Sequence, residues 1–307
     1  MNINNIRKIT KGAILKNESM ARHTTFRIGG PADYYIIPLN TKELSGLIRY
    51  FAINKIDYYV IGNGSNLLVS DKGYRGVIID LGRNDGTAFS MLGYDDSGED
   101  LIMDLGAGCL MSAVGSLSAR FGGTGFEELS GIPGCIGGAV VMNAGAFDRE
   151  MKDVLVKVEA VDRKGNILEL NKDELGLRYR GSRLMDEGLI VTRAEIALKK
   201  GNTEEINNRI EEFKKLRQEK QPVEYPSAGS VFKRPEGHFA GKLISDAGLK
   251  GLSVGDACVS EKHAGFIINR GTATAMDVYR LINMIRDKVS EQFGVCLEPE
   301  VKFLGEF

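Results

Sequence analysis

Residues 225–235, YPSAGSVFKRP, place a serine in a short basic stretch bounded by two prolines. A serine hydroxyl becomes a nucleophile when a neighbouring base takes its proton. The stretch holds no histidine, aspartate or glutamate that could be this base for Ser230. The neighbouring residues in the sequence therefore do not define what Ser230 does.

Ser230 and Lys233 also fit S-x-x-K, the acylating motif of penicillin-binding proteins and β-lactamases. In those proteins the serine opens a helix and the lysine faces it one turn later. Here Val231 and Phe232 favour an extended backbone, and Pro235 follows closely. The partner motifs S-D-N and K-T-G are absent, and LISDAG is only a partial echo. An acyl-enzyme is thus a weakly supported alternative.

Residues 62–76, GNGSNLLVSDKGYRG, follow an apolar strand-like run. The turn offers several backbone N–H groups and the side chains of Asn63, Ser65 and Asn66, which together suit an anion. It is not a dinucleotide fingerprint, because Leu67 replaces the third glycine, and it lacks the GK[ST] of a Walker loop. A pyrophosphate site and a structural turn both remain open.

Residues 130–147, SGIPGCIGGAVVMNAGAF, contain glycines at 131, 134, 137, 138 and 145. Glycine lets the backbone lie flat against a planar ring, and backbone N–H groups can bond ring heteroatoms. This density predicts a surface for a flat cofactor. The alternative is a packed glycine-rich turn.

The elements that must position these residues are mixed. Strand-like apolar runs occupy residues 33–39, 58–64, 76–81, 101–108, 154–161, 166–170 and 189–198, with a hairpin turn at 162–166. Apolar stripes predict helices over 41–56, 203–221 and 274–293. Asn40 and Glu43 fit a capping box for the first helix, and Pro222 ends the second. The elements predict an α+β or mixed α/β fold class with two or three subdomains.

The length of 307 residues indicates two domains, or one domain with a large elaboration. The net charge of −1 gives no sign of a nucleic acid or membrane-surface partner. The chain lacks a signal-like start and any apolar run of about 18 residues. Four widely spaced cysteines predict free thiols in a reducing cytoplasm. Three histidines, none at ligand spacing, predict no metal site.

GNGSNLLV, GIPGCIGGAVVMNAGA, YRGS, AGSVFKRP, SEKHAGFIIN and LEPEV occur in this order between residues 62 and 301, within a resemblance to one family that spans about residues 22–303. Together they resemble the UDP-N-acetylenolpyruvoylglucosamine reductases, and the short span from Tyr179 to Ser230 resembles their type II branch. The resemblance implies an FAD-binding domain of the vanillyl-alcohol-oxidase type, made of two α/β subdomains, and a C-terminal α+β substrate domain. We expect these parts at residues 1–82, 83–200 and 201–307, the last including a connector helix.

The resemblance also implies residue roles. FAD would be held by Gly62, Asn63, Gly64, Ser65, Asn66, Leu67, Gly131, Ile132, Pro133, Gly134, Gly137, Gly138, Asn143, Gly145 and Ala146. Residues 23–30, HTTFRIGG, would support the cofactor. The implied reaction is the NADPH-dependent reduction of UDP-N-acetylglucosamine enolpyruvate to UDP-N-acetylmuramate for peptidoglycan. Ser230 would give a proton to a carbanionic carbon, which needs no base beside it. Arg180 and Glu300 would act on the substrate carboxylate.

The nucleotide-sugar substrate carries a diphosphate, so cations should line its path. The candidates for substrate binding are Tyr179, Lys220, Lys233, Arg234, Lys242 and Lys262, and the rival interpretation of each cation is a solvated surface charge. We expect a cytoplasmic monomer or weak dimer. Two further alternatives remain: an FAD-dependent oxidase of the same superfamily, and a flavin- or nucleotide-binding regulator.

Overall fold

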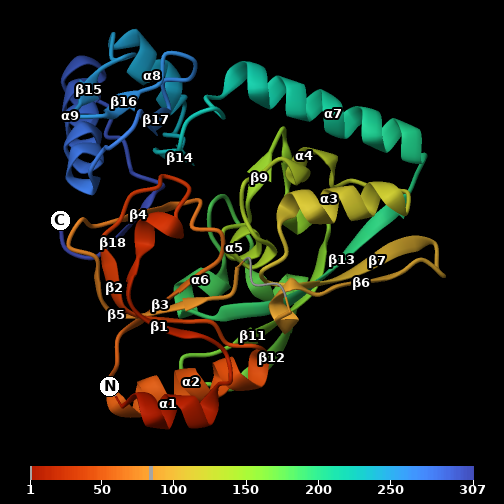
Figure 1. Cartoon of the computed structure of the whole chain (residues 1–307). Helices are drawn as coiled ribbons and strands as arrows, with labels where there is room; N and C mark the ends of the chain where they lie inside the picture. Colours follow the sequence, from red (N-terminus) through yellow and green to blue (C-terminus); the bar gives the residue numbers. More distant parts are fainter. Residues whose placement is uncertain (1, 83–85) are drawn as a thin grey trace. The chain divides into compact units, whose positions relative to one another are not determined.

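The computed structural model describes residues 2–82 and 86–307, and Figure 1 follows the chain through them. By internal contacts the chain divides into two compact units. Unit 1 contains Met1–Leu15, Tyr34–Asn63 and Gly76–Lys215, and unit 2 contains Lys16–Asp33, Gly64–Arg75 and Leu216–Phe307. The consecutive division at residues 82 and 200 stays a prediction.

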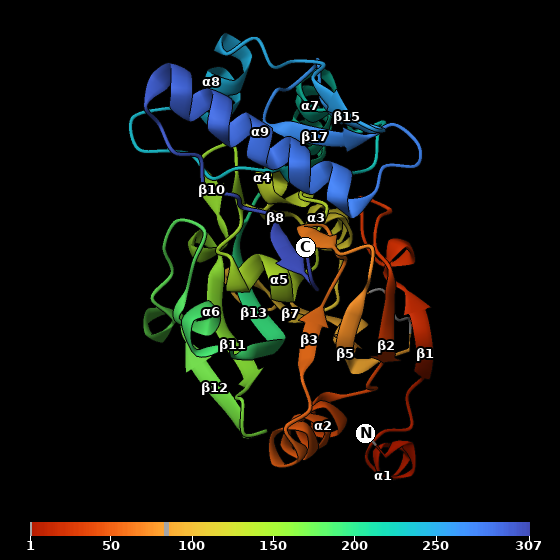
Figure 2. The same cartoon turned by 90° about the vertical axis from the view of Figure 1, so that its left-hand side faces the viewer.

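One sheet has the strand order β1 (Ile14–Ser19), β2 (Pro31–Ile36), β5 (Tyr74–Asp80), β3 (Tyr58–Ile61), as Figure 2 shows. Strands β3 and β5 run parallel. Helix α2 (Thr41–Asn54) follows β2, and α1 (Ile3–Ile9) precedes the sheet. The expected apolar stripe of α2 is buried against β2 and β5, so this helix prediction is confirmed; the stripe consists of Leu44, Leu47, Ile48 and Phe51.

The cap of α2 differs in part from the expected capping box. Asn40 accepts a hydrogen bond from the Glu43 N–H at 3.0 Å, as expected for an N-cap. The Glu43 carboxylate instead reaches beyond the cap and accepts from the Leu39 N–H at 2.8 Å and from the Thr10 hydroxyl at 2.7 Å. It thereby ties the end of α1 to the start of α2, a tertiary contact that the local pattern does not encode.

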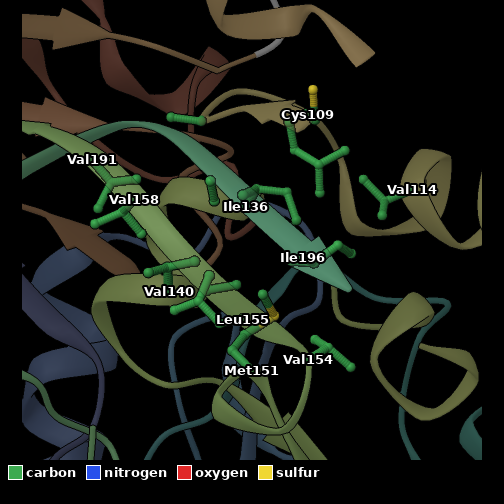
Figure 3. Close-up of a cluster of buried hydrophobic side chains, with 14 of the residues drawn as sticks. Cys109, Val114, Ile136, Val140, Met151, Val154, Leu155, Val158, Val191 and Ile196 are labelled. Atoms are coloured by element: carbon green, nitrogen blue, oxygen red, sulfur yellow. The ribbon is translucent and has the colours of Figure 1, made fainter. Parts of the chain in front are cut away.

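The larger sheet of unit 1 is antiparallel. Its order is β12 (Ile167–Asn171), β11 (Leu155–Val161), β13 (Ile190–Lys200), β7 (Asp100–Gly106), β6 (Leu92–Asp95), with β8 (Gly123–Thr124) also paired to β13. The expected hairpin is confirmed, because the Asp162 N–H bonds the Asn166 carbonyl at 2.9 Å. Figure 3 shows the core, where strand residues such as Val158 and Val191 lie with Ile136 and Val140.

Short elements follow one another beside this core. They are α3 (Met111–Arg120), α4 (Glu127–Ser130), α5 (Ile136–Val141), β9 (Gly145–Ala146), β10 (Arg149–Glu150) and α6 (Arg183–Glu187). Single 3-10 turns cover Met20–Arg22, Ala88–Ser90, Met151–Asp153 and Lys172–Leu175. The sequence did not predict α3 or α5.

Unit 2 contains an antiparallel sheet in the order β14 (Ser227–Ser230), β17 (Phe266–Asn269), β16 (Ala257–Val259), β15 (Ser253–Val254). Helices α8 (Ala240–Asp246) and α9 (Ala275–Phe293) share its core. The expected α9 stripe is confirmed, since every member is buried: Val278, Leu281, Ile282, Ile285 and Val289. Near the C-terminus, β18 (Lys302–Leu304) pairs in parallel with β4 (Leu67–Val69).

Helix α7 (Thr203–Lys220) carries the chain from unit 1 into unit 2. Its first turns are fastened to unit 1: Arg209 pairs with the buried Glu128 at 2.6 Å, and the Phe213 ring lies 4.7 Å from that of Phe147. The helix ends two residues before Pro222, as expected.

Candidate active site

The glycine-rich segment 131–146 turns tightly after α4 and continues into α5 (Figure 1). The Ile136 and Gly137 N–H groups bond the carbonyls of Cys109 and Ala107 at 2.9 and 2.8 Å, which fixes the start of α5. A Cβ at Gly137 would lie 2.9 Å from the Ala107 Cβ, so this glycine permits close packing. A Cβ at Gly138 would meet nothing within 4 Å. The exposed Gly138 thus leaves room for a flat ring, and the segment fits the expected FAD.

The structure brings the first glycine turn onto this segment. The Asn63 side-chain amide donates to the Pro133 carbonyl at 2.8 Å. A Cβ at Gly62 would lie 3.3 Å from the Cβ of Cys135. Residues that the sequence separates by about 70 positions therefore form one surface of unit 1, as a cofactor that contacts both would require.

Arg180 lies in a two-residue turn between β12 and α6. Arg178 and Gly181 pair through both backbone groups, with N–O distances of 3.0 and 3.1 Å. Arg180 has a φ of +52°, a left-handed conformation that non-glycine residues rarely adopt. Its guanidinium carbon lies 5.3 Å from the ring centre of Tyr179, which is half exposed. Strained backbone of this kind is concentrated at functional sites.

The family resemblance implies that Asn143 binds FAD, but the side chain of Asn143 is fully buried. Its amide bonds three other parts of unit 1, Glu150, Lys152 and the Arg178 carbonyl. Contact of this side chain with a cofactor would require those bonds to break. Gly145 and Ala146 form β9, and a Cβ at Gly145 would come within 2.7 Å of the Arg149 carbonyl.

In unit 2, the loop Gly64–Leu67 is held by residues 23–30. Gly64 has a φ of +61°, and a Cβ there would lie 1.9 Å from the His23 carbonyl oxygen. The Thr25 N–H donates to the Gly64 carbonyl at 3.3 Å, and the Thr25 hydroxyl donates to the Ser227 carbonyl at 2.6 Å. Thr25 therefore links the expected pyrophosphate loop to the strand of Ser230. No role within residues 23–30 was predicted from the sequence.

The Glu300 backbone bonds the residue that follows Ser230. The Glu300 N–H donates to the Val231 carbonyl at 2.7 Å, directly after Ser230. The Glu300 carbonyl accepts from the Asn66 side chain at 3.3 Å, across 234 positions of sequence. Gly229 has a φ of +75°, and the strand register shifts between Ser227 and Ser230. The Ser230 hydroxyl donates to the Phe232 carbonyl at 3.3 Å.

His263 is a neighbour of Ser230 that the sequence analysis did not single out. A Cβ at Gly265 would lie 2.9 Å from the His263 ring and 3.3 Å from the Ser230 hydroxyl oxygen. The His263 Nδ1 accepts from the Gly265 N–H at 3.1 Å, and burial lowers the pKa of the imidazole. The ring is thereby favoured in its neutral form. The feature of the sequence that could have identified His263 is its position in the motif SEKHAGFIIN.

The expected substrate cations differ in their surroundings. Lys242 pairs with Asp246 at 2.8 Å, Lys262 pairs with Glu224 at 3.2 Å, and Lys233 pairs with Glu298. A diphosphate would have to compete with these carboxylates. Arg234 lies over the exposed Phe239, with 3.9 Å from the guanidinium carbon to the ring centre, and Lys220 is exposed at the end of α7.

The local structure argues against two alternatives. Ser230 ends a strand and does not open a helix, and the Lys233 ammonium pairs with Glu298, so the S-x-x-K geometry is not formed. Cys135, the cysteine within the glycine segment, is buried. A covalent flavin tether at this thiol would therefore need the segment to open.

Within residues 2–82 and 86–307, no three His, Cys, Asp or Glu side chains are grouped so that they could hold a metal ion. None of the helices in this part of the chain is both long and apolar enough to cross a membrane. All four cysteines are free thiols, as expected.

Comparison with known proteins agrees with this arrangement. Residues 221–304 match the family model of the UDP-N-acetylenolpyruvoylglucosamine reductase C-terminal domain, and residues 32–171 match that of an FAD binding domain. The predicted fold class is thus confirmed. The chain is 50% identical over 305 residues to the UDP-N-acetylenolpyruvoylglucosamine reductase of Caldanaerobacter subterraneus subsp. tengcongensis, covering 99% of this chain and 98% of the relative.

Two further relatives are similar over nearly their full length. The enzyme of the same name from Agathobacter rectalis is 49% identical over 298 residues, which is 96% of this chain and 95% of the relative. The crystal structure of the Thermus caldophilus reductase superimposes with a TM-score of 0.79 at 39% identity, covering 96% of this chain and 99% of that one. The chain belongs to the UDP-N-acetylenolpyruvoylglucosamine reductase family and is an FAD-dependent oxidoreductase.

Proposed function

We propose that the protein reduces UDP-N-acetylglucosamine enolpyruvate to UDP-N-acetylmuramate with NADPH, as a step in peptidoglycan precursor synthesis. The names of the relatives support the substrate class. The chemistry that bound FAD supplies is hydride transfer, from NADPH and then to the enolpyruvyl methylene carbon. The cofactor would be held by the surface of Gly62, Asn63 and residues 131–146, and by the loop Gly64–Leu67.

The observation that carries the proposal is the contact between the Ser230 and Glu300 segments. Addition of hydride to one carbon leaves negative charge on its neighbour and on the attached carboxylate, so the site needs a proton donor and carboxylate partners. The 2.7 Å bond from the Glu300 N–H to the Val231 carbonyl keeps the two candidates adjacent in one unit. Ser230 gives its proton to the carbon, and Glu300 helps to polarise the carboxylate.

Arg180 is the third residue of the proposed mechanism. Its guanidinium stays charged and can bind a carboxylate through two parallel hydrogen bonds as negative charge grows there. The left-handed turn that carries it supports this role, because such backbone is costly and clusters at active sites and ligand clamps.

Ser230→Ala separates the two halves of the reaction. Under anaerobic conditions the variant should keep its flavin and let NADPH bleach it. Return of the visible absorbance on addition of the enolpyruvyl sugar should slow by about 10²–10⁴-fold, the range of general acid catalysis. The matched control is Ser253→Ala, a serine exposed on β15 of the same sheet, which should reoxidise as the parent does.

Other outcomes have distinct meanings. Loss of reduction by NADPH would assign Ser230 another task. If NADPH bleaches the flavin of the parent protein but the enolpyruvyl sugar does not restore its visible absorbance, the proposed substrate is excluded. If oxygen restores the absorbance rapidly instead, the oxidase alternative is favoured. A regulator without catalysis would keep its ligand binding and function with alanine at Arg180, Ser230 or Glu300.

The role of Arg234 is tested by the KM for the nucleotide sugar. We propose that this arginine binds the diphosphate, since the guanidinium stacked on Phe239 lies on an exposed face of unit 2. Arg234→Ala should raise KM, and an unchanged KM would exclude this role. The preference for NADPH over NADH, the type II branch, the cytoplasmic location and a monomer or weak dimer remain our predictions.

A further inference from the structure

The side chain of Asn143 joins three segments of unit 1. Its Nδ2 donates to the Arg178 carbonyl at 3.3 Å and to the Glu150 carboxylate at 3.0 Å, and its Oδ1 accepts from the Lys152 N–H at 2.9 Å. The side chain has no exposed surface. A buried amide costs free energy unless it is hydrogen-bonded, and here both donor hydrogens and the oxygen are used.

The Arg178 carbonyl is also the group that closes the Arg180 turn. It accepts from the Gly181 N–H at 3.1 Å, so one oxygen receives both the turn bond and the Asn143 bond. On the other side of the turn, the buried Ser182 hydroxyl donates to the Val141 carbonyl at 2.6 Å. The residues on both sides of Tyr179 and Arg180 are therefore fastened to residues 141–143.

The turn needs such support. A left-handed L-residue costs about 1–2 kcal/mol, and the conformation persists only where the surroundings determine it. The Arg178 side chain pairs with the exposed Asp186 at 2.7 Å, which is a weak restraint in water. The buried bonds of Asn143 and Ser182 remain as the stronger ones.

We infer that Asn143 is a positioning residue, which acts through the Arg178 carbonyl to hold the turn that presents Arg180. The inference rests on the proposed role of Arg180 in the reduction. It gives the buried amide inside the glycine-rich segment a task other than contact with the cofactor, and it couples that segment to the arginine.

The isosteric variant Asn143→Asp tests this directly. An ionised carboxylate keeps the acceptor for the Lys152 N–H but cannot donate to the Arg178 carbonyl. The charged groups around it are Glu150 and Lys152, with Arg178 and Asp186 beyond the turn. Burial and the Glu150 charge favour the protonated acid as pH falls, which restores one donor.

The expected result is a fall of about 10- to 100-fold in flavin reoxidation by the enolpyruvyl sugar at pH 8, the cost of a misplaced group. Reduction by NADPH should be retained, and reoxidation should recover towards pH 6 relative to the parent. The control is Asn166→Asp, the same chemical change in the exposed hairpin turn, which should behave as the parent at both pH values.

Two further measurements make the inference specific. In an Arg180→Ala background, Asn143→Asp should add little, because a residue that acts through the arginine has no effect without it. Trypsin should cleave the cofactor-free variant after Arg178 or Arg180 faster than it cleaves the cofactor-free parent, which reports the loosened turn without any turnover. If Asn143→Asp does not fold, Ser182→Ala should show slower reoxidation, little further loss in the Arg180→Ala background and faster trypsin cleavage at the turn.

Additive losses, or unchanged cleavage at the turn, overturn the inference and leave the proposed function intact. If Arg180→Ala itself leaves reoxidation unchanged, the role of Arg180 fails, and the inference fails with it. The two failures are thus distinguishable.

Discussion

The left-handed turn at Arg180 predicts an unusual order of stability. Arg180→Gly and Arg180→Ala both remove the guanidinium, so their difference reports the backbone alone. A positive φ at alanine costs about 1–2 kcal/mol of stability. Glycine costs about 0.5–1 kcal/mol, because its unfolded chain has more conformational freedom to lose on folding. With φ at +52°, Arg180→Gly should be the more stable variant by about 0.5–1 kcal/mol.

This difference should raise the unfolding midpoint by about 2 °C. The chain contains no tryptophan, so far-UV circular dichroism is the suitable probe. FAD should be held at one saturating concentration, because bound cofactor stabilises the folded state. Arg180→Asn should lie between the other two, since asparagine tolerates left-handed backbone better than alanine does. All three variants should lose reoxidation by the enolpyruvyl sugar.

The control is the same pair of substitutions at Lys214, an exposed position inside α7. There the order should reverse, with the glycine variant less stable by about 0.5–1 kcal/mol. The reasoning is refuted if Arg180→Ala is as stable as Arg180→Gly while the Lys214 pair behaves as expected.

The burial and packing of individual residues lead to three further predictions. Ellman's reagent should modify one thiol rapidly, that of the exposed Cys296. Burial raises the pKa of Cys109 to about 12, and the other two thiols are also buried. Rapid modification of several thiols would contradict this prediction. Burial lowers the pKa of His263 from 6.5, because the folded protein favours the neutral ring. The free energy of unfolding should therefore decrease as pH falls below about 7, where the unfolded chain binds a proton more readily than the folded protein does. His263→Gln should flatten the resulting decline in melting temperature, and an unchanged slope would contradict this reasoning. Gly138→Leu should weaken FAD binding without lowering the melting temperature of the cofactor-free protein, because a Cβ at Gly138 meets nothing within 4 Å. Gly137→Ala should lower that melting temperature, because its Cβ would lie 2.9 Å from the Ala107 Cβ. If Gly138→Leu lowered the melting temperature and left FAD binding unchanged, the cofactor would lie elsewhere.

Regular periodicity in the sequence predicted the elements that bury one face. Helices α2 and α9 and the strands of the larger sheet were found because their apolar residues recur at the spacing of the element. Helix α3 was missed because its contacts are tertiary. A Cβ at Gly115 would lie 2.4 Å from the Ser130 Cβ, so a residue that weakens a helix in isolation lets α3 approach α4 closely.

Local sequence patterns likewise do not predict the tertiary contacts of the candidate site. Ser230 stood out in its own stretch, but no local pattern links it to Glu300, since their contact is a backbone bond between segments 70 positions apart. The resemblance to a family named both residues. It did not reveal what Asn143 bonds or that His263 lies beside Ser230, because these depend on φ angles and burial that the sequence does not contain.

The parallel pair of β4 and β18 has a consequence for biosynthesis. The Asn66 side chain must wait for Glu300, 234 positions later, for its hydrogen bond, and strand β4 must wait for β18 for its pairing. At about 5–20 residues per second, a ribosome needs roughly 10–50 s for that interval. Throughout it, the apolar strand Leu67–Val69 is an open edge that can pair with other chains. The nascent protein is therefore most exposed to aggregation until residues 302–304 emerge and cover this edge.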